Sequence, residues 1–299
     1  HYKAMQGADA TTVLGDFNDV VVSYHQVDYR LFHNDSGHWV EMAQGEKREQ
    51  FKIQYTFGHY PLQQYLVEMD NGHIQALNLA WDSRSKTEGG QRWFHLREDE
   101  AITPEHPFHW KRHFQNWNSR CADCHSTNLS RNYNPVENSF DTSWSETNVG
   151  CEACHGPGSK HIELAERGKI SATLSGLEIS AVATANWQFG KDEAIAHRTS
   201  ETPSTQLDMC GRCHSLRTQL APDKAGGDYH DSNRLHLIDS NTYFEDGQIR
   251  EEAFVLGSFM QSKMYQAGVV CSNCHNVHTG KVLAEDNALC SQCHQSTVY

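Results

Sequence analysis

Long hydrophobic runs are missing from this sequence. The longest apolar stretches, such as Ala253–Leu256, fall far short of the roughly 20 residues that a membrane-spanning helix requires. Only 37% of the 299 residues are hydrophobic, and the mean hydropathy is -0.69. We therefore expect a chain that does not span a membrane and whose own side chains provide only a thin apolar core.

Basic charge is also scarce. The chain has 25 Lys and Arg against 38 Asp and Glu, which gives a net charge of -13 with neutral His. Nucleic-acid binding depends on basic patches, so a nucleic-acid partner is excluded. An acidic surface instead suits partners that carry basic docking patches, because surface charge steers encounter. The alternative is that the acidity only maintains solubility.

No cysteine stands outside a repeated motif. All ten cysteines fall in five C-x-x-C-H sequences, which is the attachment signature of a c-type haem. In this chemistry the two thiols form thioether bonds with the two vinyl groups of one haem. The His that follows is then the proximal axial ligand of the iron. The five motifs are Cys121, Cys124 and His125; Cys151, Cys154 and His155; Cys210, Cys213 and His214; Cys271, Cys274 and His275; and Cys290, Cys293 and His294.

Zinc sites, redox dithiols and disulfide frameworks also use closely spaced cysteines. A zinc site with four cysteine ligands takes C-x-x-C sequences in pairs, and five motifs leave one unpaired. None of these alternatives needs His after every second Cys. The sequence therefore predicts five covalently bound haem c groups with their iron, and we expect much of the C-terminal region to pack on porphyrin.

Residues 1–100 contain no cysteine and have strand patterns. Apolar and polar residues alternate through Phe51–Phe57, as in a half-buried strand. The Asn71-Gly72 pair predicts a hairpin between Tyr65–Met69 and Ile74–Trp81, and Asn34–Gly37 predicts another turn. We expect a small antiparallel sheet that acts as a cap or docking region.

Residues 101–299 are predicted to form the pentahaem region, mostly helical or irregular, which makes the fold class α+β. The run of His and aromatic residues at 104–114 precedes the first motif and suggests haem-pocket lining. A loop is expected at Ala221–Asp228. Short helices are expected at Ile162–Arg167, Ile179–Ala185, Asp192–His197 and Glu251–Met264.

Fifteen His remain after the five proximal ones, enough for a distal His on every haem. A six-coordinate haem carries electrons, whereas a haem with an open distal side can bind a small molecule. No C-x-x-C is followed by Lys, so the lysine-ligated haem of ammonia-forming pentahaem nitrite reductases has no counterpart. His278 lies three residues after His275, between two closely spaced motifs, so it can turn onto a neighbouring haem.

Several longer blocks carry a family resemblance. They include Gly89–Leu96, Gln115–Asn118, Cys151–Ser159 and Gly257–Tyr265. Together these blocks resemble a family of bacterial multihaem c-type cytochromes related to the cytochrome c554-like group and often fused to tetratricopeptide repeats. The resemblance implies a further C-x-x-C-H before His1 and a continuation past Tyr299. It also implies distal ligands at His1, His109, His161, His236 and His278.

The sequence and the resemblance favour an electron carrier over an enzyme. The predicted function is electron transfer between redox proteins outside the cytoplasm, in the periplasm or beyond. The first alternative is an oxidoreductase that acts on a small nitrogen or sulfur compound at one open-coordinate haem, with no catalytic residue assignable. A lesser alternative is a subunit of an extracellular cytochrome filament. The chain begins at His1 and not at Met, so we expect a cleaved signal or a fragment.

Overall fold

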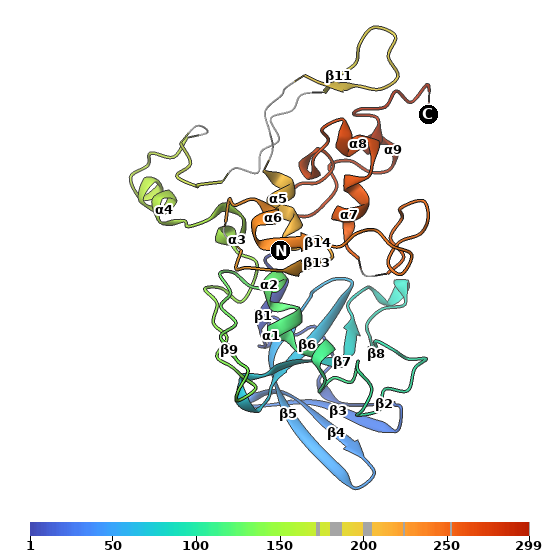
Figure 1. Cartoon of the computed structure of the whole chain (residues 1–299). Helices are drawn as coiled ribbons and strands as arrows, with labels where there is room; N and C mark the ends of the chain where they lie inside the picture. The colour runs from blue at the N-terminus through green and yellow to red at the C-terminus, as the bar shows by residue number, and fades with distance from the viewer. Residues whose placement is uncertain (172–173, 180–186, 200–204, 224, 252, 299) are drawn as a thin grey trace. The chain divides into compact units, whose positions relative to one another are not determined.

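Antiparallel strands organise the first half of the chain, in a computed structural model that describes residues 1–171, 174–179, 187–199, 205–223, 225–251 and 253–298 (Figure 1). The chain divides into two compact units, residues 1–150 and 151–299. The first motif belongs to the same unit as the strands, and the other four motifs belong to the second. The predicted functional division at residue 100 remains a prediction.

Eight strands form one sheet in the first unit. Neighbouring strands pair antiparallel in the order β2-β3-β4-β5-β6-β7-β8, and β1 pairs with the C-terminal part of β5. The strands are β1 Met5–Gly7, β2 Asn18–Tyr24, β3 Val27–Asn34, β4 Gly37–Gln44, β5 Lys47–Phe57, β6 Leu62–Glu68, β7 Ile74–Asp82 and β8 Arg92–His95. This meander confirms the predicted β-rich N-terminal region.

Both predicted hairpins are present. β6 and β7 pair through Glu68 and Ile74, and the short helix η1 (Asp70–Gly72) joins them. Asn71 and Gly72 have φ angles of 60° and 71°, a left-handed region that Asn and Gly tolerate best. β3 and β4 meet at the Asn34 and Gly37 pair, so the predicted turn is also confirmed.

The sheet buries side chains on both faces, because strand residues alternate between them. In β6, Tyr65 and Val67 enter one cluster of buried residues, and Leu66 enters the other. We call the first cluster the main core; it consists of Phe17, Tyr29, Leu31, Val40, Met42, Ile53, Tyr65, Val67, Leu77, Leu79, Trp81, Trp93 and Trp110. We call the second the motif-side core; it consists of Met5, Leu66, Ile74, Ala76, Trp117 and Ala122.

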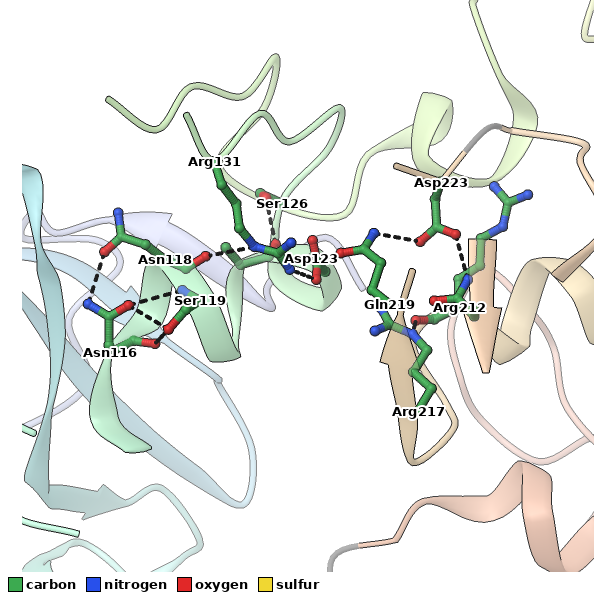
Figure 2. Close-up of polar contacts among 12 residues, drawn as sticks. Asn116, Asn118, Ser119, Asp123, Ser126, Arg131, Arg212, Arg217, Gln219 and Asp223 are labelled. Atoms are coloured by element: carbon green, nitrogen blue, oxygen red, sulfur yellow. Dashed lines mark hydrogen bonds and ion pairs between the residues drawn. The ribbon is translucent and has the colours of Figure 1, made fainter. Parts of the chain in front are cut away.

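Two asparagines fix the helical turn α1 (Trp117–Arg120) to the sheet. The Asn118 side chain is fully buried, accepts a hydrogen bond from the Ile74 N–H at 2.7 Å and donates to the Gly72 carbonyl at 3.1 Å. Asn116 donates to the Gln75 side chain at 2.9 Å and caps α1 through the Ser119 N–H. Figure 2 shows both asparagines beside α1. The first haem motif follows α1 directly and is therefore carried on a rigid base.

The second unit consists of short helices and two small hairpins. β11 (Trp187–Gln188) pairs with β12 (His197–Arg198), and β13 (Arg217–Gln219) pairs with β14 (Asn233–Leu235). The helices are α3 Cys151–His155, α4 Ser159–Glu166, α5 Gln206–Gly211, α6 Tyr229–Ser232, α7 Val255–Met260, α8 Lys263–Gln266, η4 Cys271–Asn273 and α9 Asn287–Cys290. With the sheet, this arrangement confirms the predicted α+β class.

The helix predictions in this unit succeeded in part. The helix at Ile162–Arg167 is confirmed as α4, which begins three residues earlier at Ser159. The prediction for Asp192–His197 was wrong, because this segment forms a turn and then enters β12. Glu251–Met264 is not one helix, since α7 ends at Met260 and Ser262 caps the separate α8. The prediction for Ile179–Ala185 lies almost wholly outside the described residues.

None of the helices within the described ranges has the length and apolar character needed to cross a bilayer.

Replacement of Gly72 by Ala should destabilise the first unit more than the same change at Gly45. Both glycines have positive φ, so each Ala should cost about 1 kcal/mol. A Cβ at Gly72 would lie 2.0 Å from the Phe140 carbonyl oxygen, whereas nothing lies within 4 Å of a Cβ at Gly45. We expect a loss of about 2–4 kcal/mol for Gly72→Ala. Equal losses in urea unfolding, followed by circular dichroism, would contradict this packing.

Candidate haem-binding sites

Each C-x-x-C-H motif folds into a helical turn. The first lies in α2 (Ala122–His125) and the second in α3, while the others extend from α5, η4 and α9. Residues three and four apart in a helix share one face. Each turn therefore directs its two thiols and its imidazole to the same side, which is the arrangement that two thioethers and one axial bond to a single haem require.

The backbone hydrogen bonds of four turns repeat the same pattern. The N–H of the second cysteine donates to the carbonyl of the first at 3.1–3.2 Å in the first, third, fourth and fifth motifs. In the last three of these motifs, the His N–H donates to the same carbonyl at 2.9–3.0 Å. The second motif lies wholly in α3. The repetition indicates one common way of presenting the five sites.

The first motif is built against the sheet. Cys121 packs on the motif-side core, and burial raises the pKa of its thiol to about 12. The His125 ring lies 4.2 Å from the Phe57 ring, and burial lowers the pKa of this imidazole. Its Nδ1 lies 3.1 Å from the Ala4 carbonyl, which can only accept, so Nδ1 donates. Nε2 thereby keeps the lone pair that an iron ligand needs.

In the second motif, a backbone carbonyl again fixes the proton of the imidazole on Nδ1. His155 Nδ1 donates to the Ile179 carbonyl at 2.8 Å, so its Nε2 is also free to ligate. The His278 ring faces the His155 ring with centroids 6.1 Å apart and planes inclined by 25°. The structure thus brings together a predicted proximal His and a predicted distal His.

The third and fourth motifs are tied to one another. Gln206 is fully buried, and its Nε2 donates to Ser272 Oγ at 2.7 Å. The Ser272 N–H donates back to Gln206 Oε1 at 3.0 Å. The thiols of Cys210 and Cys271 are hydrogen-bonded, which raises the pKa of Cys210 and lowers that of Cys271 to about 7. Both are the first cysteines of their motifs, so two attachment points are in contact.

The fifth motif is held by a distant segment of the chain. The Ala196 N–H donates to the Cys293 carbonyl at 2.8 Å, and the Gln295 N–H donates to the Ala194 carbonyl at 2.9 Å. This bridge explains why Asp192–His197 is not helical, because its backbone pairs with the motif.

Large apolar side chains of the second unit fit a porphyrin. Both clusters of buried hydrophobic residues found among the described residues lie in the first unit. The second unit instead exposes many large apolar side chains near its motifs. Examples are Ile162, Leu174, Ile195, Val255, Met264, Val282 and Leu283. A flat hydrophobic macrocycle at each motif would cover such groups, so the residues present fit the predicted haem groups.

Other predicted distal His have different surroundings. His161 lies in α4, and its Nδ1 donates to the Ser175 carbonyl at 2.7 Å, which leaves Nε2 free as in the proximal His. At His109, Nδ1 instead accepts from the Lys111 N–H at 3.2 Å. In a neutral ring its Nε2 then carries the proton and lacks a free lone pair. His1 and His236 are exposed, and His236 follows β14.

Two stretches of the chain match known families. Residues 80–156 match the family described as cytochrome c554 and c-prime, and residues 264–298 match the doubled CXXCH motif. Both matches support a multihaem c-type cytochrome family for this chain. No curated protein and no solved structure gives a significant match. The matches support covalently bound haem c and an electron-transfer role for this cytochrome.

The aromatic run that precedes the first motif of the cytochrome divides between two environments. Trp117, three residues after the predicted run at 104–114, packs with Cys121 in the motif-side core. Trp110 instead packs in the main core, where its ring lies 4.9 Å from Phe51. Trp110 therefore stabilises the sheet.

Several residues that hold the motifs and nearby loops in place were not predicted from the sequence. Gln206 and Ser272 are 66 positions apart, and Ser272 occupies a variable position of the fourth motif, so no pattern pairs them. Asp223, labelled in Figure 2, accepts hydrogen bonds from Ser232 and Asn233 at 2.7 and 2.6 Å. These bonds hold the loop after β13 against the start of β14. This arrangement agrees with the loop predicted at Ala221–Asp228.

The first unit of the cytochrome also has a cavity of 520 Å³. It is lined by residues 8–18 and the β3–β4 hairpin, including His33 and His38, and contains no motif residue.

Replacement of Gln206 by Ala should destabilise the second unit by about 1–3 kcal/mol, because a buried donor and acceptor lose their partner. Gln266 is an exposed Gln of the same unit, and Gln266→Ala provides the control. Thermal unfolding of both holo variants, followed at the haem absorption band, checks this expectation. If the two melting temperatures agree, Gln206 does not tie the motifs together.

Proposed function

We propose that this cytochrome carries five haem c groups and passes electrons between redox proteins outside the cytoplasm. The observation that carries the proposal is the recurrence of one helical turn that presents two thiols and one imidazole on the same face. The iron of each bound haem would supply a one-electron ferric/ferrous couple. The chain would attach the haem, ligate the iron and set its surroundings.

The count of five depends on the third motif. The family matches cover the first, second, fourth and fifth motifs, and Cys210–His214 lies outside both. The third turn nevertheless has the backbone hydrogen bonds of the fourth and fifth. We therefore assign thioether bonds to all ten cysteines and proximal ligation to His125, His155, His214, His275 and His294.

Among the five predicted distal ligands we favour His278, because its ring lies close to that of a predicted proximal His. The centroids of His155 and His278 are 6.1 Å apart. With its Nδ1 bonded to Ile179, His155 is already oriented as a ligand. His161 is supported by its own Nδ1 bond, whereas His109, His1 and His236 have no comparable support.

These contacts suggest an order of haems in the second unit. His278 belongs to the loop after the fourth motif, so its proposed bond to the iron of the second motif links those two haems. The contact between Cys210 and Cys271 links the fourth haem to the third. Electrons would then pass between the second, fourth and third haems over short distances.

Partners and location follow from charge and chemistry. The net charge of -13 favours redox proteins with basic docking patches, through long-range steering. Haem c attachment in bacteria takes place outside the cytoplasmic membrane, which supports a periplasmic or extracellular site.

Replacement of Cys210 and Cys213 by Ala should lower the haem content from five to four. Intact mass and a pyridine haemochrome assay measure this directly. Cys290→Ala with Cys293→Ala serves as the matched control, because its motif lies inside a family match. A wild-type content of four that the first variant leaves unchanged would show that the third motif carries no haem.

Replacement of His278 by Ala should convert one low-spin haem to high-spin, because one iron loses its distal imidazole. Low-temperature EPR of the oxidised protein measures the change, and His33→Ala is the control at a His remote from any motif in sequence. The reverse outcome, an unchanged low-spin signal in the His278 variant, would remove this residue from the ligand set.

A further inference from the structure

The acidic character of the chain is interrupted just before the first motif. Residues 106–122 contain Lys111, Arg112 and Arg120 but no Asp or Glu, in a chain of net charge -13. A local basic stretch of this kind creates a field opposite to that of the whole molecule.

Two of the three cations keep their charge available. Lys111 is neutralised, because its Nζ lies 2.9 Å from both carboxylate oxygens of Glu49. Neither Arg112 nor Arg120 forms an ion pair with a residue that the structure describes, and both are exposed. The Arg112 Nε donates to the Pro104 carbonyl at 2.8 Å, which fixes its side chain without cancelling its charge.

Aromatic rings order this surface. Phe114 is 45% exposed and stacks on Phe108 with centroids 4.9 Å apart. The Arg120 guanidinium lies 4.8 Å from the Phe114 ring, and the Arg97 guanidinium lies 3.9 Å from the Phe108 ring. Such cation–π contacts hold long side chains in place, so less conformational entropy is lost on binding.

The base of this surface is rigid. Trp110 and Trp117, which flank Arg112 and Phe114 in the sequence, are buried, and Asn116 bonds to the sheet. Arg120 directly precedes Cys121, so a group held by Arg120 would lie next to the first attachment point. The nearness of such a group to a haem rests on the proposed haem attachment at Cys121 and Cys124.

We propose that Arg112, Phe114 and Arg120 form a docking surface for a redox protein that presents carboxylates around its own redox centre. We call these three residues the cationic port. Arg and exposed aromatic residues are the commonest anchors of protein interfaces. Guanidinium groups bind carboxylates through paired, charge-assisted hydrogen bonds. A long polyanion such as nucleic acid is disfavoured, because the rest of the acidic chain would repel it.

The two partners of the cytochrome would therefore differ in charge. The overall acidic surface attracts a basic partner, whereas the cationic port selects an acidic one beside the first haem. Opposite charges would keep the donor and the acceptor from competing for the same site.

A fluorescein-labelled peptide of eight glutamates tests the port by anisotropy with the holoprotein at low ionic strength. Arg112→Gln with Arg120→Gln should weaken binding about tenfold, since the bonds from two guanidinium groups are lost. Lys47→Gln with Arg48→Gln removes the same charge from the β4–β5 turn and should change binding little. Haem content and circular dichroism establish that each variant is folded.

Three outcomes would overturn the proposal. The first is no binding of the peptide by the wild type, and the second is equal weakening in both double variants. The third is equally tight binding of a labelled octathymidylate, which would show a general anion site. The haem content of Cys121→Ala with Cys124→Ala tests attachment separately, so failure of the port is distinguishable from failure of the first haem site.

Discussion

Everything in this cytochrome depends on placing two thiols and one imidazole on the same face of a single helical turn. The constraint is local, because residues three and four apart in a helix meet on one side. A short turn of four or five residues meets it without a long helix, as α2 and α3 show. The rest of the chain then has two tasks, which are to hold these turns in place and to complete the surroundings of each haem. The first unit does so with a sheet, and the second with backbone bridges and buried amides.

The sheet could be predicted because its pattern is periodic. Alternation in Phe51–Phe57 and the Asn71-Gly72 turn correspond to β5 and the β6–β7 hairpin. The second unit was harder to predict, because polar segments without periodicity take their conformation from distant partners. Ala194 and Ala196 illustrate this, since their backbone is extended to pair with the fifth motif. A single helix over Glu251–Met264 also failed, because Ser262 begins a new turn by capping it.

The residues of the candidate site also fall into two groups, those that local spacing predicts and those that depend on tertiary contacts. Spacing alone was enough to propose the ten cysteines and the five proximal His, since attachment chemistry acts within five residues. Distal partners belong to tertiary structure, and sequence offered only a count of spare His. The contact of His155 with His278 joins residues more than a hundred positions apart. Gln206 and Ser272 are 66 positions apart, and no sequence pattern predicted that they would pair. The donor and acceptor roles of His109 and His161 likewise depend on backbone groups that no pattern reveals.

The contact between Cys210 and Cys271 has a consequence for biogenesis. At the proposed location outside the cytoplasm, two thiols that share a hydrogen bond, one of them with a lowered pKa, are the starting point for a disulfide. Such a crosslink would join two motifs and block both from thioether formation. During maturation, thioether formation at Cys210 and Cys271 therefore competes with formation of a disulfide between them. If both turns carry haem as proposed, attachment there has to precede the formation of a Cys210–Cys271 disulfide.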